Sequence, residues 1–187
     1  MSFNKFALFG ASLILVGTSC QMVAQGPQLT TGTQRSAVGL GYETTTASAP
    51  SYNDLDVTSL LLNVSHGWFV ANNAEIGGKL IYEGREADDG VTKSEFDAYL
   101  LAAFARFYFD GGTNLYPYVE GLLGIGNVDF GTSDDDFMRM SLGIGVMNFL
   151  TESTALDAIV KYEKDSYDLS EVDIEGIRME LGYSVFW

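Results

Sequence analysis

Alternation of apolar and polar residues is the feature that most restricts how this chain can fold. In a β-strand successive side chains point to opposite faces, so a period of two indicates a strand with one apolar face. Near the C-terminal end, for example, Ile177, Met179 and Leu181 alternate with Arg178 and Glu180. Eight segments of this kind are predicted, over residues 36–42, 59–68, 75–85, 99–107, 118–126, 139–146, 156–163 and 176–185.

The length of these segments and the connections between them indicate the architecture. About ten residues is the span of a tilted membrane-crossing strand. Connections at 71–73, 110–114 and 151–154 are predicted to be short, and those at 47–56, 86–94, 129–136 and 164–172 to be longer. Outer-membrane barrels have short periplasmic turns and longer external loops. The chain is therefore predicted to be all-β, an eight-stranded antiparallel up-and-down transmembrane β-barrel with both termini in the periplasm.

A soluble lipocalin-like barrel would show the same alternation, with its apolar face inside. The polar face of this chain instead carries glycines and equal numbers of acids and bases, which suits a narrow interior in which buried charges pair. Segment 99–107 is apolar on both faces, and only Arg106 indicates which of them points inward. The predicted interior charge network is Glu75, Lys79, Glu83, Arg85, Arg106, Glu120, Arg139, Asp157, Lys161, Glu163, Arg178 and Glu180.

The aromatic residues fall into two groups along the predicted strands. The first, at the predicted periplasmic ends, is Trp68, Phe69, Phe107, Tyr108, Phe109, Tyr116, Tyr118, Phe149, Tyr183, Phe186 and Trp187. The second, at the opposite ends, is Tyr42, Tyr82, Phe96, Tyr99, Phe130, Phe137, Tyr162 and Tyr167. Aromatic rings favour the headgroup level of a bilayer, so the two groups are predicted to form belts on either side of a membrane.

Residues 1–24 have the features of a cleavable signal peptide. Lys5 precedes a short apolar stretch, and cleavage is predicted after Ala24. A lipoprotein signal that ends at Cys20 is the alternative. Residues 25–34 then form a short N-terminal segment and residues 35–187 the barrel domain. Cleavage after Ala24 leaves no cysteine, so strand pairing and packing must hold the domain together without disulfides.

Two glycine-rich stretches, at 116–126 and 142–146, resemble strands of the OmpA/OmpX-like small outer-membrane barrels. The resemblance covers most of residues 35–187 and implies a porin-like protein of the outer membrane in a Gram-negative envelope. The last strand also resembles the signal that such barrels present for assembly, through Glu180, Gly182, Val185 and Trp187. The implied partners are outer-membrane lipids, including lipopolysaccharide, and the barrel assembly machinery. Members of this superfamily include membrane anchors, adhesins, pores and a few lipid-modifying enzymes.

Charge restricts the function further. The net charge of −15 opposes binding to nucleic acid, whose phosphates would be repelled. Acids gather in the predicted external loops, where we expect a solvated collar that repels itself. A divalent-cation site is the alternative, but the aspartates lack the spacing of a calcium loop. The collar residues are Asp54, Asp56, Glu86, Asp88, Asp89, Asp134, Asp135, Asp136, Asp165, Asp168 and Glu171.

Catalysis is not predicted. His66 is the sole histidine, and the adjacent Ser65 points to the opposite face of the strand. A lipid A deacylase of this superfamily would use a His-Ser-acid set on the lipid-facing wall. His66 falls on that wall, but low on its strand, and the sequence alone places no outward serine or threonine beside it. His66 is therefore interpreted as a polar residue at the membrane interface, with no catalytic or metal residues and no cofactor.

The predicted function is that of a non-enzymatic integral outer-membrane protein. Its interior is expected to be salt-bridged and closed, and it would serve envelope integrity or surface interaction through the acidic loops and an unknown extracellular ligand. The main alternative is a small pore for small polar or apolar solutes. An adhesin is less favoured because the loops are short, and a lipid A-modifying enzyme because no catalytic set is found.

Overall fold

The computed structural model describes residues 29–47, 55–88, 93–111, 114–129, 134–167 and 173–187. Within these ranges the chain forms eight strands, and no helix there is long and apolar enough to cross a membrane. The predicted signal peptide and Cys20 lie outside the described residues. The strands are β1 (Gln34–Ala47), β2 (Leu55–Ala71), β3 (Ala74–Asp88), β4 (Lys93–Tyr108), β5 (Leu115–Asp129), β6 (Asp134–Phe149), β7 (Thr154–Tyr167) and β8 (Asp173–Phe186).

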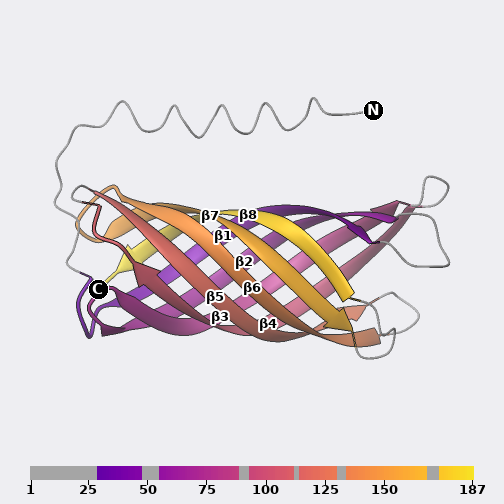
Figure 1. The fold of residues 1–187 in the computed structure, drawn as a ribbon, viewed down its shortest axis with the longest axis horizontal. Coiled ribbons are helices and arrows are strands. Elements are labelled where there is room, and N and C mark those ends of the chain that lie inside the picture. Colours follow the sequence, from indigo (N-terminus) through magenta and orange to yellow (C-terminus); the bar gives the residue numbers. More distant parts are fainter. Residues whose placement is uncertain (1–28, 48–54, 89–92, 112–113, 130–133, 168–172) are drawn as a thin grey trace, which may run out of the picture.

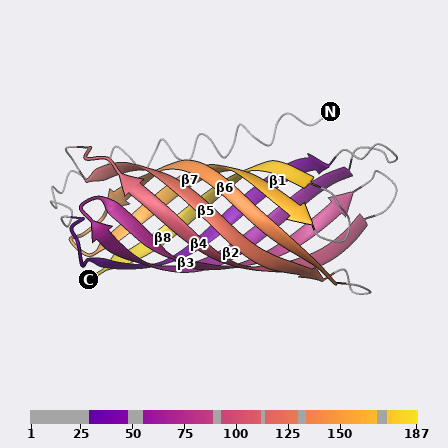
Figure 2. The same cartoon turned by 60° about the horizontal axis from the view of Figure 1, so that its bottom comes forward.

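The strands form one closed antiparallel barrel (Figure 1). Each strand pairs with its neighbours in sequence, and β1 also pairs with β8, so that every strand has two partners. Figure 2 shows the strands crossing the barrel obliquely, as closure of a twisted sheet requires. The predicted fold is therefore confirmed. The end with the β2–β3, β4–β5 and β6–β7 connections is termed the proximal end, and the opposite end is the distal end.

The strands are longer than predicted, with 14 to 17 residues each. Pairing continues into segments that we predicted as loops, because backbone hydrogen bonds form there whether or not the side chains alternate. The distal connections shrink to residues 48–54, 89–92, 130–133 and 168–172, while the proximal ones are 72–73, 109–114 and 150–153. The predicted strict alternation of long and short connections is wrong, since 109–114 exceeds three of the four distal connections in length.

The outer wall of the barrel is apolar. Leu142 and Ile144 of β6 are 69% and 71% exposed, and Leu40, Leu80 and Ile177 on other strands are also exposed. A continuous surface of this kind is suited to hydrocarbon rather than to water. On β4 the inner face is Arg106 together with apolar side chains. These inner apolar residues of β4 are Ala98, Leu100, Ala102 and Phe104, and they explain why the sequence of β4 is apolar on both faces.

The interior is filled at the proximal end by apolar side chains, which we term the proximal core. Its buried members are Leu29, Phe69, Tyr108, Tyr118, Met147, Phe149, Ala155, Ile159 and Phe186. Leu29, from the segment before β1, is only 2% exposed. The backbone fixes this segment, because Asn73 N donates to Leu29 O at 2.8 Å and Gly32 N donates to Phe69 O at 2.9 Å. The sequence did not predict that this segment packs against the barrel.

The predicted aromatic belts are wrong in part, because many of the rings point inward. Consecutive residues of a strand face opposite sides. Thus Trp68 and Phe107 are exposed, whereas their neighbours Phe69 and Tyr108 are buried in the proximal core. At the distal end Tyr82, Tyr99, Tyr42 and Tyr162 face outward, while Phe137 and Tyr167 are buried and Phe96 is half-buried. Phe130 lies outside the described residues.

Candidate functional site: the charged barrel interior

All twelve predicted charges lie on the inner face of the barrel, and each is at most 7% exposed. Ion pairs join them into three clusters along the barrel, which we term distal, central and proximal. Three further buried charges, Arg35, Glu43 and Asp165, belong to these clusters and were not predicted there.

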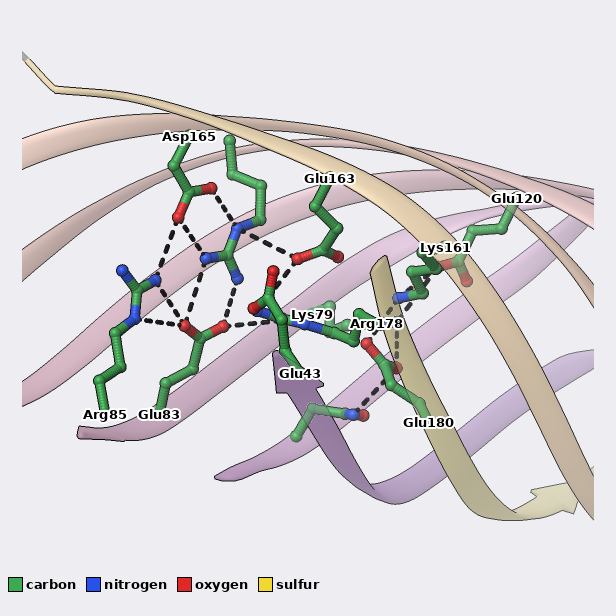
Figure 3. Close-up of polar contacts among 12 residues, drawn as sticks. Glu43, Lys79, Glu83, Arg85, Glu120, Lys161, Glu163, Asp165, Arg178 and Glu180 are labelled. Carbon is green, nitrogen blue, oxygen red and sulfur yellow. Dashed lines mark hydrogen bonds and ion pairs between the residues drawn. The ribbon is translucent and has the colours of Figure 1, made fainter. Parts of the chain in front are cut away.

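The distal cluster is centred on Arg139 of β6. Figure 3 labels its partners Glu83, Glu163 and Asp165. The Arg139 guanidinium is paired with Glu83 and lies 2.6 Å from Asp165. Arg85 approaches the same two carboxylates, at 2.6 Å from Glu83 and 3.1 Å from Asp165. Arg85 also donates to the hydroxyl of Tyr167 at 2.5 Å. The planar guanidinium groups match carboxylates in a two-point geometry, which fixes β3, β6 and β7 against one another.

Arg178 of β8 completes the distal cluster. Its guanidinium lies 2.6 Å from Glu43, 2.7 Å from Glu83 and 3.0 Å from Glu163. Glu163 is also 3.4 Å from Arg139. Glu83 therefore lies between three arginines, and none of the carboxylates in this cluster is buried without a cation beside it.

The central cluster contains both interior lysines. The ammonium of Lys161 lies 2.7 Å from Glu180 and 2.9 Å from Glu120, and that of Lys79 lies 3.5 Å and 3.3 Å from the same two groups. Arg106 pairs with Glu120 at 2.5 Å. Figure 3 shows Lys161 pointing across the interior toward Glu180 and Glu120. Two carboxylates thus pair with three cations, and these ion pairs connect strands from opposite sides of the barrel.

The proximal cluster borders the proximal core. Arg35 Nε donates to Glu75 at 2.9 Å, and the Tyr108 hydroxyl donates to the same carboxylate at 2.6 Å. Asp157 accepts from the Ser184 hydroxyl at 2.9 Å and lies 3.9 Å from Arg35. Ion-paired side chains and apolar side chains are therefore in contact at this level of the barrel.

An aromatic ring lies among the cations. The Phe104 ring centroid is 5.5 Å from the Arg106 guanidinium, 5.7 Å from that of Arg35 and 5.8 Å from the Lys79 ammonium. Cations are attracted to the face of an aromatic ring at such distances. Among the residues that the structure describes, no group of three or more histidine, cysteine, aspartate or glutamate side chains is arranged to hold a metal ion.

The acidic collar needs correction. Asp165 does not lie in a loop, because β7 continues to Tyr167, and its parity with Lys161 and Glu163 turns it inward. Asp135 is buried for the same reason at the start of β6. Glu86, Asp56 and Asp88 also lie in strands, and Asp134 and Asp136 point outward. The remaining collar residues, Asp54, Asp89, Asp168 and Glu171, lie outside the described ranges. The alternation of inward and outward side chains, continued toward the distal ends of β1 and β7, would have placed Glu43 and Asp165 on the inner face.

The residues of the assembly signal lie in β8 and beside it. Glu180 belongs to the central cluster, and a side chain at Gly182 would collide with the Asp157 carboxylate. Val185 and Trp187 face outward. The backbone of Trp187 is hydrogen-bonded to Gln34 at the start of β1, so this stretch forms part of the closing seam.

His66 lies on the outer wall near the proximal end and has a partner that the sequence did not reveal. Ser36 of β1 lies directly opposite His66 of β2 in the strand register. The Ser36 Oγ and His66 Nδ1 are 2.9 Å apart. Strand register joins residues that are far apart in sequence, so local pattern could not have found this pair.

No family model matches the sequence, and no curated protein does either. Among solved structures, the barrel is similar to Neisserial surface protein A, with a TM-score of 0.65 and 18% identity over 82% of this chain and 96% of that one. It is also similar to the outer membrane protein OprG from Pseudomonas aeruginosa, with a TM-score of 0.57 and 13% identity over 88% of this chain and 99% of that one. The chain therefore has the fold of the small eight-stranded outer-membrane β-barrels of the OmpA/OmpX-like type.

Proposed function

We propose that this protein is a non-enzymatic integral barrel of the bacterial outer membrane whose interior is closed to solutes. The fold and the apolar outer wall support insertion into a membrane. The observation that carries the closed interior is the succession of three ion-paired clusters followed by the proximal core. Such a barrel contributes to envelope integrity, or to surface interaction through its distal connections.

Desolvation explains why the interior favours closure. An unpaired ion in so narrow a space would cost several kcal/mol, whereas paired ions offset one another. Opening a path for solutes would separate groups such as Arg139 and Asp165, which lie 2.6 Å apart. It would also require displacement of buried rings such as Phe69 and Phe149 from the proximal core.

The proposed orientation has the proximal end, and with it both termini, in the periplasm. The connections support it, because the shortest one, 72–73, is proximal and the longest one, 48–54, is distal, and outer-membrane barrels have short periplasmic turns and longer external loops. The distal end also carries exposed acids, which are Glu95, Asp97, Asp129, Asp134, Asp136 and Glu175. Outer-membrane lipids, including lipopolysaccharide, and the barrel assembly machinery are the proposed partners.

Conductance in planar bilayers tests the closed interior. The wild-type protein is expected to give no steady conductance, because the ion pairs and the proximal core block the interior. Reproducible openings that are abolished by Arg139→Ala or Glu120→Ala would overturn closure and identify a small pore.

Membrane insertion is tested separately. In the membrane fraction, folded and boiled samples are expected to migrate differently on a gel, since a barrel resists unfolding by detergent at room temperature. A folded, monodisperse protein in buffer without detergent would overturn insertion. Cysteines introduced singly at exposed positions 134 and 72 then report orientation: a reagent that cannot cross the membrane should label the first, and not the second, on intact cells.

A further inference from the structure

The Ser36–His66 pair lies on the outer wall beside Val185 and Gly78, with the polar Gln34 opposite Trp68 next to it. The His66 ring contacts Trp68 edge-on, with centroids 4.4 Å apart, and lies 5.7 Å from the ring of Trp187. Opposite His66 on β3 is Gly78, which has no side chain to cover the imidazole on that flank. The ring is therefore held between Ser36 and two indoles, and it is half-buried.

The contact to Ser36 determines what the other ring nitrogen can do. If the Ser36 hydroxyl donates to Nδ1, the neutral imidazole carries its proton on Nε2; if the ring is charged, both nitrogens donate. In both of these states Nε2 is a donor, whereas in the other neutral tautomer Nδ1 donates to Ser36 and Nε2 is an acceptor. A phosphate beside the ring would select the two states in which Nε2 donates. Within the described ranges no hydrogen bond is formed by Nε2, so its donor is directed to the surroundings of the barrel. At the headgroup level of a membrane, the acceptor for such a donor is water or an oxygen of a lipid headgroup.

An apolar hollow begins beside this pair. It is an open groove of about 950 Å³ on the outer wall, with Trp68 and Ile76 in its lining at the proximal end and Tyr162 and Lys164 further on; neither Ser36 nor His66 lines it. Small residues, Ala105 and Gly121, leave space along its course. Trp68 contacts the His66 ring, so a polar donor and an apolar groove adjoin on the outer wall.

This arrangement does not fit hydrolysis. In serine hydrolases the nitrogen that faces the serine is Nε2, and an acid holds Nδ1. Here Ser36 is on Nδ1. The residues directly opposite Ser36 and His66 on the neighbouring strands are Val185 and Gly78, and neither carries a carboxylate. The pair is therefore arranged to donate a hydrogen bond to a ligand rather than to act as a nucleophile and its base.

We propose that Ser36 and His66 form a binding site for one glycerophospholipid at the proximal rim, with the lipid phosphate accepting from His66 Nε2 and an acyl chain in the hollow next to Trp68. This inference rests on the proposed insertion of the barrel into a membrane. A phosphodiester supplies the acceptor, and its acyl chain matches the apolar lining, so one molecule satisfies both parts of the site.

The single histidine allows a direct test. The protein, labelled with ¹⁵N-histidine, is reconstituted into nanodiscs of phosphatidylethanolamine and phosphatidylglycerol, and ³¹P–¹⁵N dipolar dephasing is measured by solid-state NMR. We expect dephasing at Nε2 and none at Nδ1. Equal dephasing at both nitrogens, or dephasing at neither, would overturn the proposal. Release of lysophospholipid would also overturn it, in favour of hydrolysis.

Matched variants test the donor without relying on the imidazole. A glutamine amide reaches the position of Nε2, whereas an asparagine amide reaches that of Nδ1. Native mass spectrometry of protein released from the same nanodiscs should therefore show a retained phospholipid for the wild type and His66→Gln, and its loss for His66→Asn. Retention by both variants, or loss from both, contradicts the proposed contact.

Two further measurements distinguish a lipid site from a site for free phosphate, and failure of the lipid site from failure of membrane insertion. In phosphate-free maltoside micelles, inorganic phosphate alone should leave the Nε2 signal unchanged, because it cannot occupy the hollow; a shift equal to that caused by lipid would mean a site for free phosphate and overturn the lipid site. Each sample is also run on a heat-modifiability gel. A folded, inserted barrel without Nε2 dephasing refutes the lipid site alone, whereas a barrel that does not insert refutes the proposed function.

Discussion

At its proximal end the barrel interior is packed with side chains such as Leu29 and Phe149, whereas at its distal end the ion-paired Arg139 and Arg178 lie beside a second apolar cluster that includes Phe137. Apolar packing is non-directional and depends chiefly on volume. An ion-paired cluster depends on each partner, because the loss of one leaves the others charged and buried. The two ends should therefore respond differently to the same kind of substitution.

The outer faces of the two ends differ as well. At the proximal end the exposed residues of the strands and of the stretch after β8 include Trp68 and Trp187, and exposed acids such as Glu152 lie in the connections. At the distal end the strands themselves carry exposed acids, such as Asp134 and Glu175.

The largest effect is expected at the distal cluster. Arg139→Met should lower the free energy of unfolding by about 3–5 kcal/mol, because Glu83, Glu163 and Asp165 lose a buried partner. Arg139→Lys should also be clearly destabilising, since an ammonium cannot reproduce the two-point contact. Urea titration in lipid vesicles, followed by heat modifiability, measures both.

The control is Lys164→Met, which removes an exposed pair with Glu175 at 3.7 Å whose side chains are 40% and 50% exposed. It should cost less than about 1 kcal/mol. Equal losses for Arg139→Met and Lys164→Met would show that burial does not govern the distal cluster.

A smaller loss is expected at the proximal core. Leu29→Ala should destabilise the barrel by about 2–4 kcal/mol, because Leu29 is buried and its truncation leaves a cavity. Leu29→Met keeps the volume and should cost less than about 1.5 kcal/mol. The same urea titration applies. If Leu29→Met were as damaging as Leu29→Ala, the contrast between a tolerant proximal end and a demanding distal end would fail.

Gly145 reports how tightly the proximal core is packed, and Gly121 on the outer wall is its control. A methyl group on Gly145 would lie 2.4 Å from the Tyr118 ring, whereas one on Gly121 would meet nothing within 4 Å. Gly145→Ala should therefore cost about 1–3 kcal/mol, and Gly121→Ala should stay within about 0.5 kcal/mol. Thermal unfolding in detergent, compared for the two variants, would refute tight packing if their midpoints were equal.

The smallest effect is expected in the outward tyrosines. The Tyr82 hydroxyl donates to Asp97 at 2.8 Å, so Tyr82→Phe should cost roughly 0.5–1.5 kcal/mol. No hydrogen bond of the Tyr183 hydroxyl is found in the described part of the chain, and Tyr183→Phe should be close to neutral. A larger loss for Tyr183→Phe, in the same unfolding assay, would reverse the expected order of the two ends.

The strands and their faces could be predicted because a period of two is a local property of the sequence. Strand ends could not, since the polar residues of β6 and β7 near the distal end pair their backbones as readily as apolar ones do. That is why Asp165 was assigned to a loop. The aromatic residues were assigned to belts only by their position along the barrel axis. The alternation of faces along each strand would have placed Phe69 and Phe186 in the interior. The Ser36–His66 contact depends on the register between β1 and β2, which no local pattern contains.

The seam between β1 and β8 has a consequence for how the barrel forms. It pairs Arg35 with Phe186, which are separated by nearly the whole described chain, so the entropy of closing that loop must be met before the pairing can stabilise anything. Until then a nearly finished sheet has two open edges, each able to capture a strand of another molecule. Shielding those edges during the last step of folding is thus what separates a monomeric barrel from an aggregate.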